Sequence, residues 1–148
     1  AVGPLAVYGA AVDPKDGVAT LRAQGFSKLA VADAERSAYG VATGELIDDL
    51  GLSDALKDKL VVATDELDAL AKVDKGECQL AIVPLGLVRP RQDGRVWEVP
   101  EPLHAGLPHA VGLVQRKDAH PRAREFLDFL FDAATQQLLA ESGWQRGR

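Results

Sequence analysis

The chain has 148 residues, of which 47% are hydrophobic and 26% charged, and its formal net charge is −5 at neutral pH. This composition excludes a disordered chain and allows either one ordinary domain or two small lobes that share elements. The negative charge and the lack of a basic stripe argue against a nucleic-acid surface, although backbone N–H dipoles can still hold an anion.

Cysteine content and apolar run lengths set further bounds. Cys78 is the single cysteine, so an internal disulfide is excluded, and its apolar surroundings indicate an inert thiol. No apolar run approaches the roughly 18 residues that span a membrane. The first residues lack the basic segment of a signal peptide, so an exported protein would carry its signal outside this chain.

Strand and helix patterns alternate through the first two thirds of the chain. Unbroken apolar runs predict buried strands at 4–9, 28–33, 59–63 and 79–84. Helical spacing and capping residues predict helices from Asp16 to about Gly25, over 40–50, from Ser53 to Lys57, and from Thr64 or Asp65 to Lys72. This alternation predicts an α/β fold with a mostly parallel sheet flanked by helices.

The pattern changes after Pro84. Strands are predicted at 95–99 and 109–115, on either side of a proline-rich connection over 100–108. Pro121 is expected at the first position of a helix, and helical signals continue to Ser142. The helix at 121–131 is apolar on nearly every side, which favours an additional domain or subunit as its partner, with deep burial in the same lobe as the alternative.

The turn KLAVADAERSAYG, residues 28–40, is the first candidate site because a helix start follows a buried strand there. Backbone N–H groups at a helix start lack intrahelical partners and favour an anion. The candidate oxyanion ligands are Ser37, Ala38, Tyr39 and Gly40, with the Tyr39 hydroxyl as a further donor. The alternative is an ordinary serine N-cap followed by a packing tyrosine.

A second helix start, at Asp65 and Glu66, also follows a strand. In a parallel sheet the two helix starts meet at the carboxyl ends of the strands, where ligands commonly bind. Carboxylates that faced an anion would repel it; alternatively, they only complement the helix dipole.

Catalytic and metal-binding patterns are absent from the sequence. The three histidines have no metal-ligand spacing and are expected at the surface. No nucleophile-elbow, P-loop, dinucleotide or zinc-protease motif occurs, so we expect no enzyme, no cofactor and no direct metal site.

Four longer stretches occur in order: KLAVADAERSAYG, VVATDELDALAKVDKGECQLAIVPLGLV, RVWEVPEPLHAGLPHAVGLV and HPRAREFLDFLFDAATQQLLAESGW. In this order they resemble the periplasmic molybdate-binding proteins of ABC transporters. Residues 38–40 match the family's A-P-Y-G turn, with Ala38 in place of proline, and Glu66 matches the valine of its E-N-V helix start. Pro84 stands where some members have a ligand tyrosine.

The resemblance implies a type II periplasmic-binding fold, with two lobes joined by crossover strands around an oxyanion. It places the second ligand-binding lobe at 10–108. Residues 1–9 and 109–148 would be crossover strands and C-terminal helices that belong to a first lobe, which is absent from this chain.

The resemblance also implies a function. The chain would bind molybdate or tungstate in the periplasm through Ser37, Ala38, Tyr39, Gly40, Asp65 and Glu66. Its partners would be the membrane subunits of an ABC transporter, and a first lobe or a self-associating copy would cover helix 121–131. The alternative is a sensor or interaction domain of the same fold that has lost anion binding.

Overall fold

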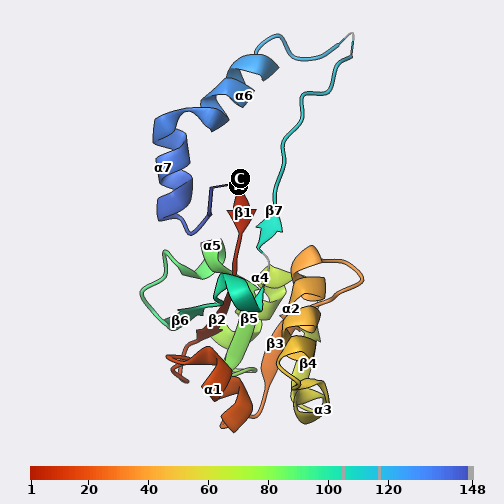
Figure 1. Cartoon of the computed structure of the whole chain (residues 1–148), viewed down its shortest axis with the longest axis vertical. Helices are drawn as coiled ribbons and strands as arrows, with labels where there is room; N and C mark the ends of the chain where they lie inside the picture. The colour runs from red at the N-terminus through yellow and green to blue at the C-terminus, as the bar shows by residue number, and fades with distance from the viewer. Residues whose placement is uncertain (105, 117, 147–148) are drawn as a thin grey trace.

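A five-stranded sheet in the order β4-β3-β5-β2-β6 forms the centre of the fold (Figure 1). The computed structural model describes residues 1–104, 106–116 and 118–146. The strands are β1 Val2–Gly3, β2 Leu5–Gly9, β3 Leu29–Ala32, β4 Leu60–Ala63, β5 Leu80–Pro84, β6 Arg95–Glu98 and β7 Leu107–Pro108. β3 is parallel to β4 and β5, whereas β2 is antiparallel to β5 and β6. Four of the five strands therefore run in one direction, as predicted.

Helices flank this sheet and continue beyond it toward the C-terminus (Figure 1). The helices are α1 Gly17–Ala23, α2 Ala38–Asp49, α3 Ser53–Leu56, α4 Glu66–Asp74, α5 Leu85–Val88, the 3-10 turn η1 Glu101–Leu103, α6 Ala123–Phe131 and α7 Ala133–Glu141. The predicted strands and helices of the sheet lobe are thus confirmed to within a few residues. The short α5 was not expected, because Pro84 and Gly86 indicated only the end of a strand.

The sheet is buried on both faces, which explains the unbroken apolar runs of its strands. Side chains alternate along β2: Leu5 and Val7 pack with α1, α2 and α3, whereas Ala6 and Tyr8 pack with residues of α4 and α5. The same alternation in β5 places Leu80 and Ile82 on the first face. Because these central strands carry apolar residues at every position, the chain can cover the sheet with helices on two sides.

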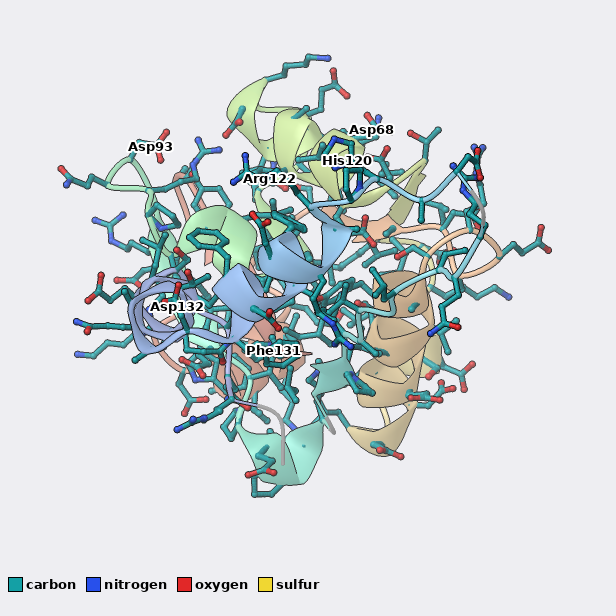
Figure 2. All side chains as sticks on the ribbon, turned by 90° about the horizontal axis from the view of Figure 1, so that it is seen from above. Asp68, Asp93, His120, Arg122, Phe131 and Asp132 are labelled. Carbon is teal, nitrogen blue, oxygen red and sulfur yellow. The ribbon has the colours of Figure 1, made fainter. Side chains whose placement is uncertain are left out.

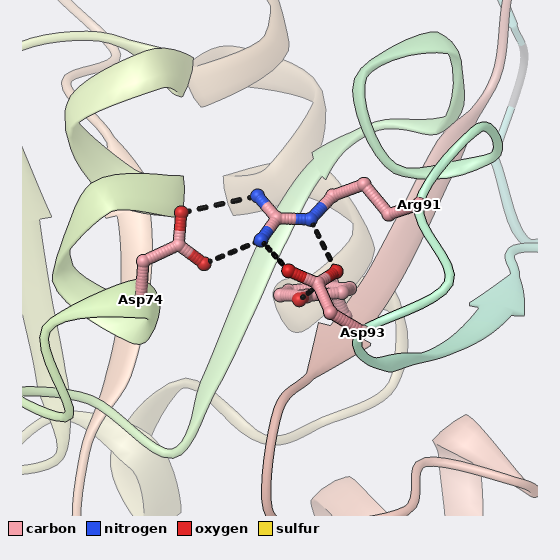
Figure 3. A network of polar contacts seen from close by, with 4 residues as sticks. Asp74, Arg91 and Asp93 are labelled. Carbon is pink, nitrogen blue, oxygen red and sulfur yellow. Dashed lines mark hydrogen bonds and ion pairs between the residues drawn. The ribbon is translucent and has the colours of Figure 1, made fainter.

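A polar network joins α4 to the loop before β6 (Figure 3). The guanidinium of Arg91 donates to both carboxylate oxygens of Asp74, at 2.8 and 3.0 Å, and also to Asp93. It lies 5.1 Å from the centre of the Tyr8 ring, and the Tyr8 hydroxyl donates to Asp93. The hydrogen bonds from Arg91 lower the pKa of Asp93 to about 2. The network therefore ties the end of α4 to the loop before β6 through one arginine.

The termini meet in a short ribbon made of residues 1–3, 107–109 and Gln145, which we call the terminal ribbon. β1 pairs with β7 on one side, and Val2 exchanges two backbone hydrogen bonds of 2.8 Å with Gln145 on the other. The ribbon connects the sheet lobe with α6 and α7, which extend away from it (Figure 1). Viewed from above, His120 and Arg122 lie near the start of α6, and Phe131 and Asp132 near its end (Figure 2).

The predicted strand at 109–115 is wrong. The chain is extended there, but β7 ends at Pro108 and no strand of the described residues pairs with the segment beyond the terminal ribbon. Val111 is 50% exposed and Val114 71% exposed. The apolar pattern is that of a strand, but a strand also needs a hydrogen-bonding neighbour, and the described residues supply none.

Two predicted helix starts also differ from the structure. α6 begins at Ala123, and Pro121 lies in the preceding turn. Ser53 is the first residue of α3 and not its cap, because its hydroxyl donates to Asp48 instead. The two C-terminal helices are separated at Asp132, which adopts an extended conformation and caps α7 through the N–H of Thr135.

Candidate functional site

The starts of α2 and α4 lie at the same edge of the sheet. β3 and β4 are parallel neighbours in register from Leu29 and Leu60 to Ala32 and Ala63, and a helix begins a few residues after each strand. The prediction that the two helix starts lie at the same edge of the sheet is therefore confirmed. This edge brings together Ser37, Ala38, Tyr39, Gly40, Asp65 and Glu66.

Local hydrogen bonds shape the turn that leads into α2. The backbone oxygen of Asp33 accepts from Arg36 and Ser37, and its side chain accepts from the N–H of Glu35. Ser37 caps the helix, because its hydroxyl oxygen accepts from the N–H groups of Tyr39 and Gly40 at 3.0 and 3.2 Å. The serine N-cap of the alternative interpretation is therefore present, and it occupies two of the expected anion donors.

Gly40 lets α2 approach the end of β3 closely. A Cβ atom at this position would lie 2.6 Å from the backbone oxygen of Ala32 and 2.8 Å from the nitrogen of Ala34. Both neighbours are backbone atoms, so a larger residue would push the helix start away from the strand.

A side-chain contact joins the two helix starts. The hydroxyl of Ser37 donates to the carboxylate of Glu66, which is the first residue of α4. Asp65 instead caps its own helix, with its carboxylate accepting from the N–H of Asp68 at 2.8 Å. Of the two acids, Asp65 thus complements its own helix start, as in the alternative interpretation, and Glu66 reaches across to α2.

Several backbone donors remain free at this edge. The N–H groups of Ala38, Glu66 and Leu67 have no acceptor among the described residues, as expected for the first residues of a helix. Ala38 and Leu67 are exposed. The edge therefore presents unused N–H groups from two helices together with one carboxylate.

The side chain of Tyr39 lies against the terminal ribbon. A Cβ atom at Gly3 would lie 2.0 Å from the Tyr39 hydroxyl, and the Tyr39 and His109 ring centres are 5.8 Å apart. His109 in turn meets the edge of Trp144 at 4.7 Å. The hydroxyl is buried without a partner among the described residues. Burial, and secondarily the charge of Glu66, raises the pKa of Tyr39 to about 12, so this hydroxyl stays protonated at neutral pH.

Sequence reasoning missed the ring cluster of Tyr39, His109 and Trp144 because no spacing pattern links residues so far apart in the chain. It was also wrong about His104, which is only 8% exposed and whose Nε2 has no partner among the described residues. Burial lowers the pKa of His104 and favours its neutral form. His109 and His120 are exposed, as expected.

Nothing in the described part of the chain indicates catalysis or a metal centre. No group of three or more His, Cys, Asp or Glu side chains in residues 1–104, 106–116 and 118–146 could hold a metal ion. Cys78 is buried, and burial raises the pKa of its thiol, which makes it a poor nucleophile. Among the same residues, no helix combines the length and apolar character that crossing a membrane requires.

Curated proteins of similar sequence bind molybdate. The chain is 31% identical over 153 residues to the molybdate-binding protein ModA of Azotobacter vinelandii, covering 97% of this chain and 59% of the relative. It is 24% identical over 144 residues to ModA of Rhodobacter capsulatus, covering 97% and 57%. The chain thus spans less than two thirds of the length of these relatives.

Solved structures have the same fold. The substrate-binding domain of a putative molybdenum ABC transporter from Clostridium difficile superposes with a TM-score of 0.80 at 25% identity, over 99% of this chain and 65% of that one. The periplasmic molybdate-binding protein of Azotobacter vinelandii superposes with a TM-score of 0.79 at 18% identity, over 99% and 66%. These similarities confirm the predicted α/β periplasmic-binding fold.

The family comparison covers nearly the whole chain. The model of the family described as "Bacterial extracellular solute-binding protein" matches residues 1–145. Members of this family are binding proteins, which agrees with the expectation that the chain is not an enzyme. The chain belongs to the family of bacterial extracellular solute-binding proteins.

Proposed function

We propose that the chain binds a tetrahedral oxyanion, molybdate or tungstate, for uptake by an ABC transporter from the periplasm. The observation that carries this proposal is the set of free N–H groups at Ala38, Glu66 and Leu67, which lie at one edge of the sheet. The similarity to two molybdate-binding proteins supplies the ligand class. The membrane subunits of a transporter are the corresponding partners.

Neutral donors suit this ligand. The chain has a net charge of −5, so long-range attraction does not favour a dianion, and recognition has to come from local dipoles. N–H groups at the starts of α2 and α4 provide such dipoles without adding formal charge. We assign Ala38 and Glu66 as backbone donors, and Ser37, Tyr39, Gly40 and Asp65 as the residues that shape the two helix starts.

We further propose that residues 10–108 form one ligand-binding lobe and that 1–9 and 109–148 contact a second lobe or another copy. The exposed apolar side chains support this: Phe126 is 61% exposed, Phe129 56% and Phe131 67%. The chain covers 59% of the length of a molybdate-binding relative, so that relative is long enough to contain a further lobe. Donors from one lobe reach only one side of a tetrahedral anion, so the second lobe would complete the site.

Calorimetric titration with molybdate tests the proposal directly. We expect saturable heat with molybdate and tungstate and weaker heat with the smaller sulfate. The variant Ala38→Pro restores the proline of the family's turn and removes one free N–H at a first helical position where proline is tolerated. Weaker binding would assign that N–H to the anion, whereas unchanged binding would leave the N–H groups of Glu66 and Leu67 as the donors. No heat with any oxyanion, for the chain alone or mixed with a separately produced first lobe of a relative, would reject the proposal.

The hydrogen bond between Ser37 and Glu66 favours a second candidate, a sensor or interaction domain that has lost anion binding. The carboxylate already lies at the start of α2, where it can take the place of an anion. This candidate predicts no heat for the natural chain and measurable heat for Glu66→Val. Heat from anion binding by the natural chain, or no heat from either protein, counts against this candidate.

Light scattering tests the proposed partner of the C-terminal helices. We expect the chain alone to self-associate, because three phenylalanines on one helix are mostly exposed. The variant Phe126→Ser/Phe129→Ser is expected to be monomeric at the same concentration. A stable monomer for the natural chain would contradict the second-copy part of the proposal.

A further inference from the structure

Glu66 is the acidic side chain that reaches from the start of α4 to the start of α2. Its carboxylate accepts a hydrogen bond from the Ser37 hydroxyl, and no second donor to it is present among the described residues. The Ser37 oxygen is itself engaged with the N–H groups of Tyr39 and Gly40. An oxyanion bound between the two helix starts would therefore lie beside a carboxylate that offers no hydrogen.

The other titratable groups near Glu66 have settled protonation states or separate partners. Asp65 caps α4, and Asp68 accepts from the N–H of Thr64, a hydrogen bond that lowers its pKa. Tyr39 keeps its proton at neutral pH because its pKa is raised to about 12. The preceding turn adds Asp33, Glu35 and Arg36. The Asp33 side chain accepts from the N–H of Glu35, while Glu35 and Arg36 are exposed to solvent.

Two acceptors in contact repel each other unless a proton lies between them. Molybdate, tungstate and sulfate carry no proton at neutral pH and offer only acceptors. A proton on Glu66 changes this carboxyl from an acceptor into a donor, so that it adds an O–H to the free N–H groups. It also removes one negative charge from the site.

We propose that an oxyanion binds at this edge together with one proton, which is held between Glu66 and the anion. The inference rests on the proposed function and deepens it: Glu66 is the specificity-determining residue of the site. The proposal also distinguishes two classes of oxyanion. One that retains its own proton at neutral pH, such as hydrogen phosphate, can bind without protonating Glu66.

Calorimetry in two buffers of different ionisation enthalpy measures the proton directly. For molybdate and the natural chain, we expect an uptake of about one proton per anion. The affinity should fall about tenfold for each unit by which the pH is raised, as linkage to the uptake of one proton requires. Glu66→Gln, which keeps the shape of a protonated carboxyl, should take up no proton, bind independently of pH and be the tighter binder at alkaline pH.

The control is Glu35→Gln, which removes one negative charge from the turn before Ser37 without touching the contact. It should leave the proton uptake and the pH slope of the natural chain unchanged. Molybdate binding without proton uptake would overturn this inference and leave oxyanion binding intact. If Glu66→Gln binds and the natural chain does not, the proposed proton-coupled binding is overturned and the second candidate, a domain that has lost anion binding, is favoured. If no protein gives heat, the proposed function itself is rejected.

Discussion

The helices α2 and α6 are both rich in apolar residues, but only α2 buries them. In α2, Tyr39, Ala42, Leu46 and Ile47 are all buried against the sheet. In α6 no residue is buried, and Phe126 and Phe129 stack on each other with ring centres 6.4 Å apart. A local pattern is enough to form both helices, whereas burial requires a neighbouring surface, which the described residues provide only for α2.

The same contrast extends from these helices to the regions around them. The sheet lobe covers both faces of its strands, and its apolar residues form two clusters. The C-terminal region consists of an extended segment and a helix pair whose largest apolar side chains face solvent. The lobe is therefore expected to supply most of the folding stability, and the C-terminal region most of the surface available for association.

The largest expected effect separates the two helices directly. Leu46→Ala, at a side chain that is 1% exposed, should lower the free energy of unfolding by about 2–5 kcal/mol. Phe129→Ala removes more atoms but should cost less than about 0.5 kcal/mol, since its side chain is 56% exposed. Urea unfolding of both variants measures the difference. A large cost for Phe129→Ala would mean that α6 is covered in solution.

A second comparison uses two glycines of one helix. Gly40→Ala should destabilise the lobe by about 1–3 kcal/mol, because the new Cβ would lie 2.6 Å from a backbone oxygen of β3. Gly44→Ala, with no atom within 4 Å of its Cβ, should stabilise the protein by about 0.5–1 kcal/mol. Equal shifts in the thermal midpoint would show that α2 does not pack as closely on β3 as its geometry indicates.

Most of the lobe could be predicted from the sequence because its signals are local. The apolar runs at 28–33 and 79–84 and the caps Asp16, Ser37 and Asp65 each determine a strand or a helix start without distant information. The predicted strand at 109–115 was wrong because strand formation does not depend on local signals alone. Its pattern is equally local, but a strand also depends on a neighbour that the described chain lacks.

The candidate site was predictable only in part. The meeting of two helix starts follows from parallel strands, so Ser37 and Glu66 could be expected near each other. The directions in which the side chains of Asp65 and Glu66 point could not be predicted. The same sequence allows a carboxylate either to face a bound anion or to cap its own helix. The structure shows that Glu66 reaches across to Ser37, whereas Asp65 caps its own helix. The ring cluster around Gly3 joins residues 39, 109 and 144, and no periodicity relates them.

The smallest expected effect concerns the coupling between the two regions. Asp16 caps α1 in the lobe, and Asp132 caps α7 in the C-terminal pair, each through one backbone N–H. Asp16→Ala should lower the global free energy of unfolding by about 1 kcal/mol.

Asp132→Ala should instead speed amide exchange within α7 by a similar free energy and leave the global transition unchanged, since the helix pair makes little buried contact. Hydrogen exchange resolved by residue, combined with urea unfolding, distinguishes these outcomes. If Asp132→Ala shifts the global transition as much as Asp16→Ala does, the two regions unfold as one unit. The terminal ribbon, and with it Trp144 against His109, would then transmit stability from the lobe to α7.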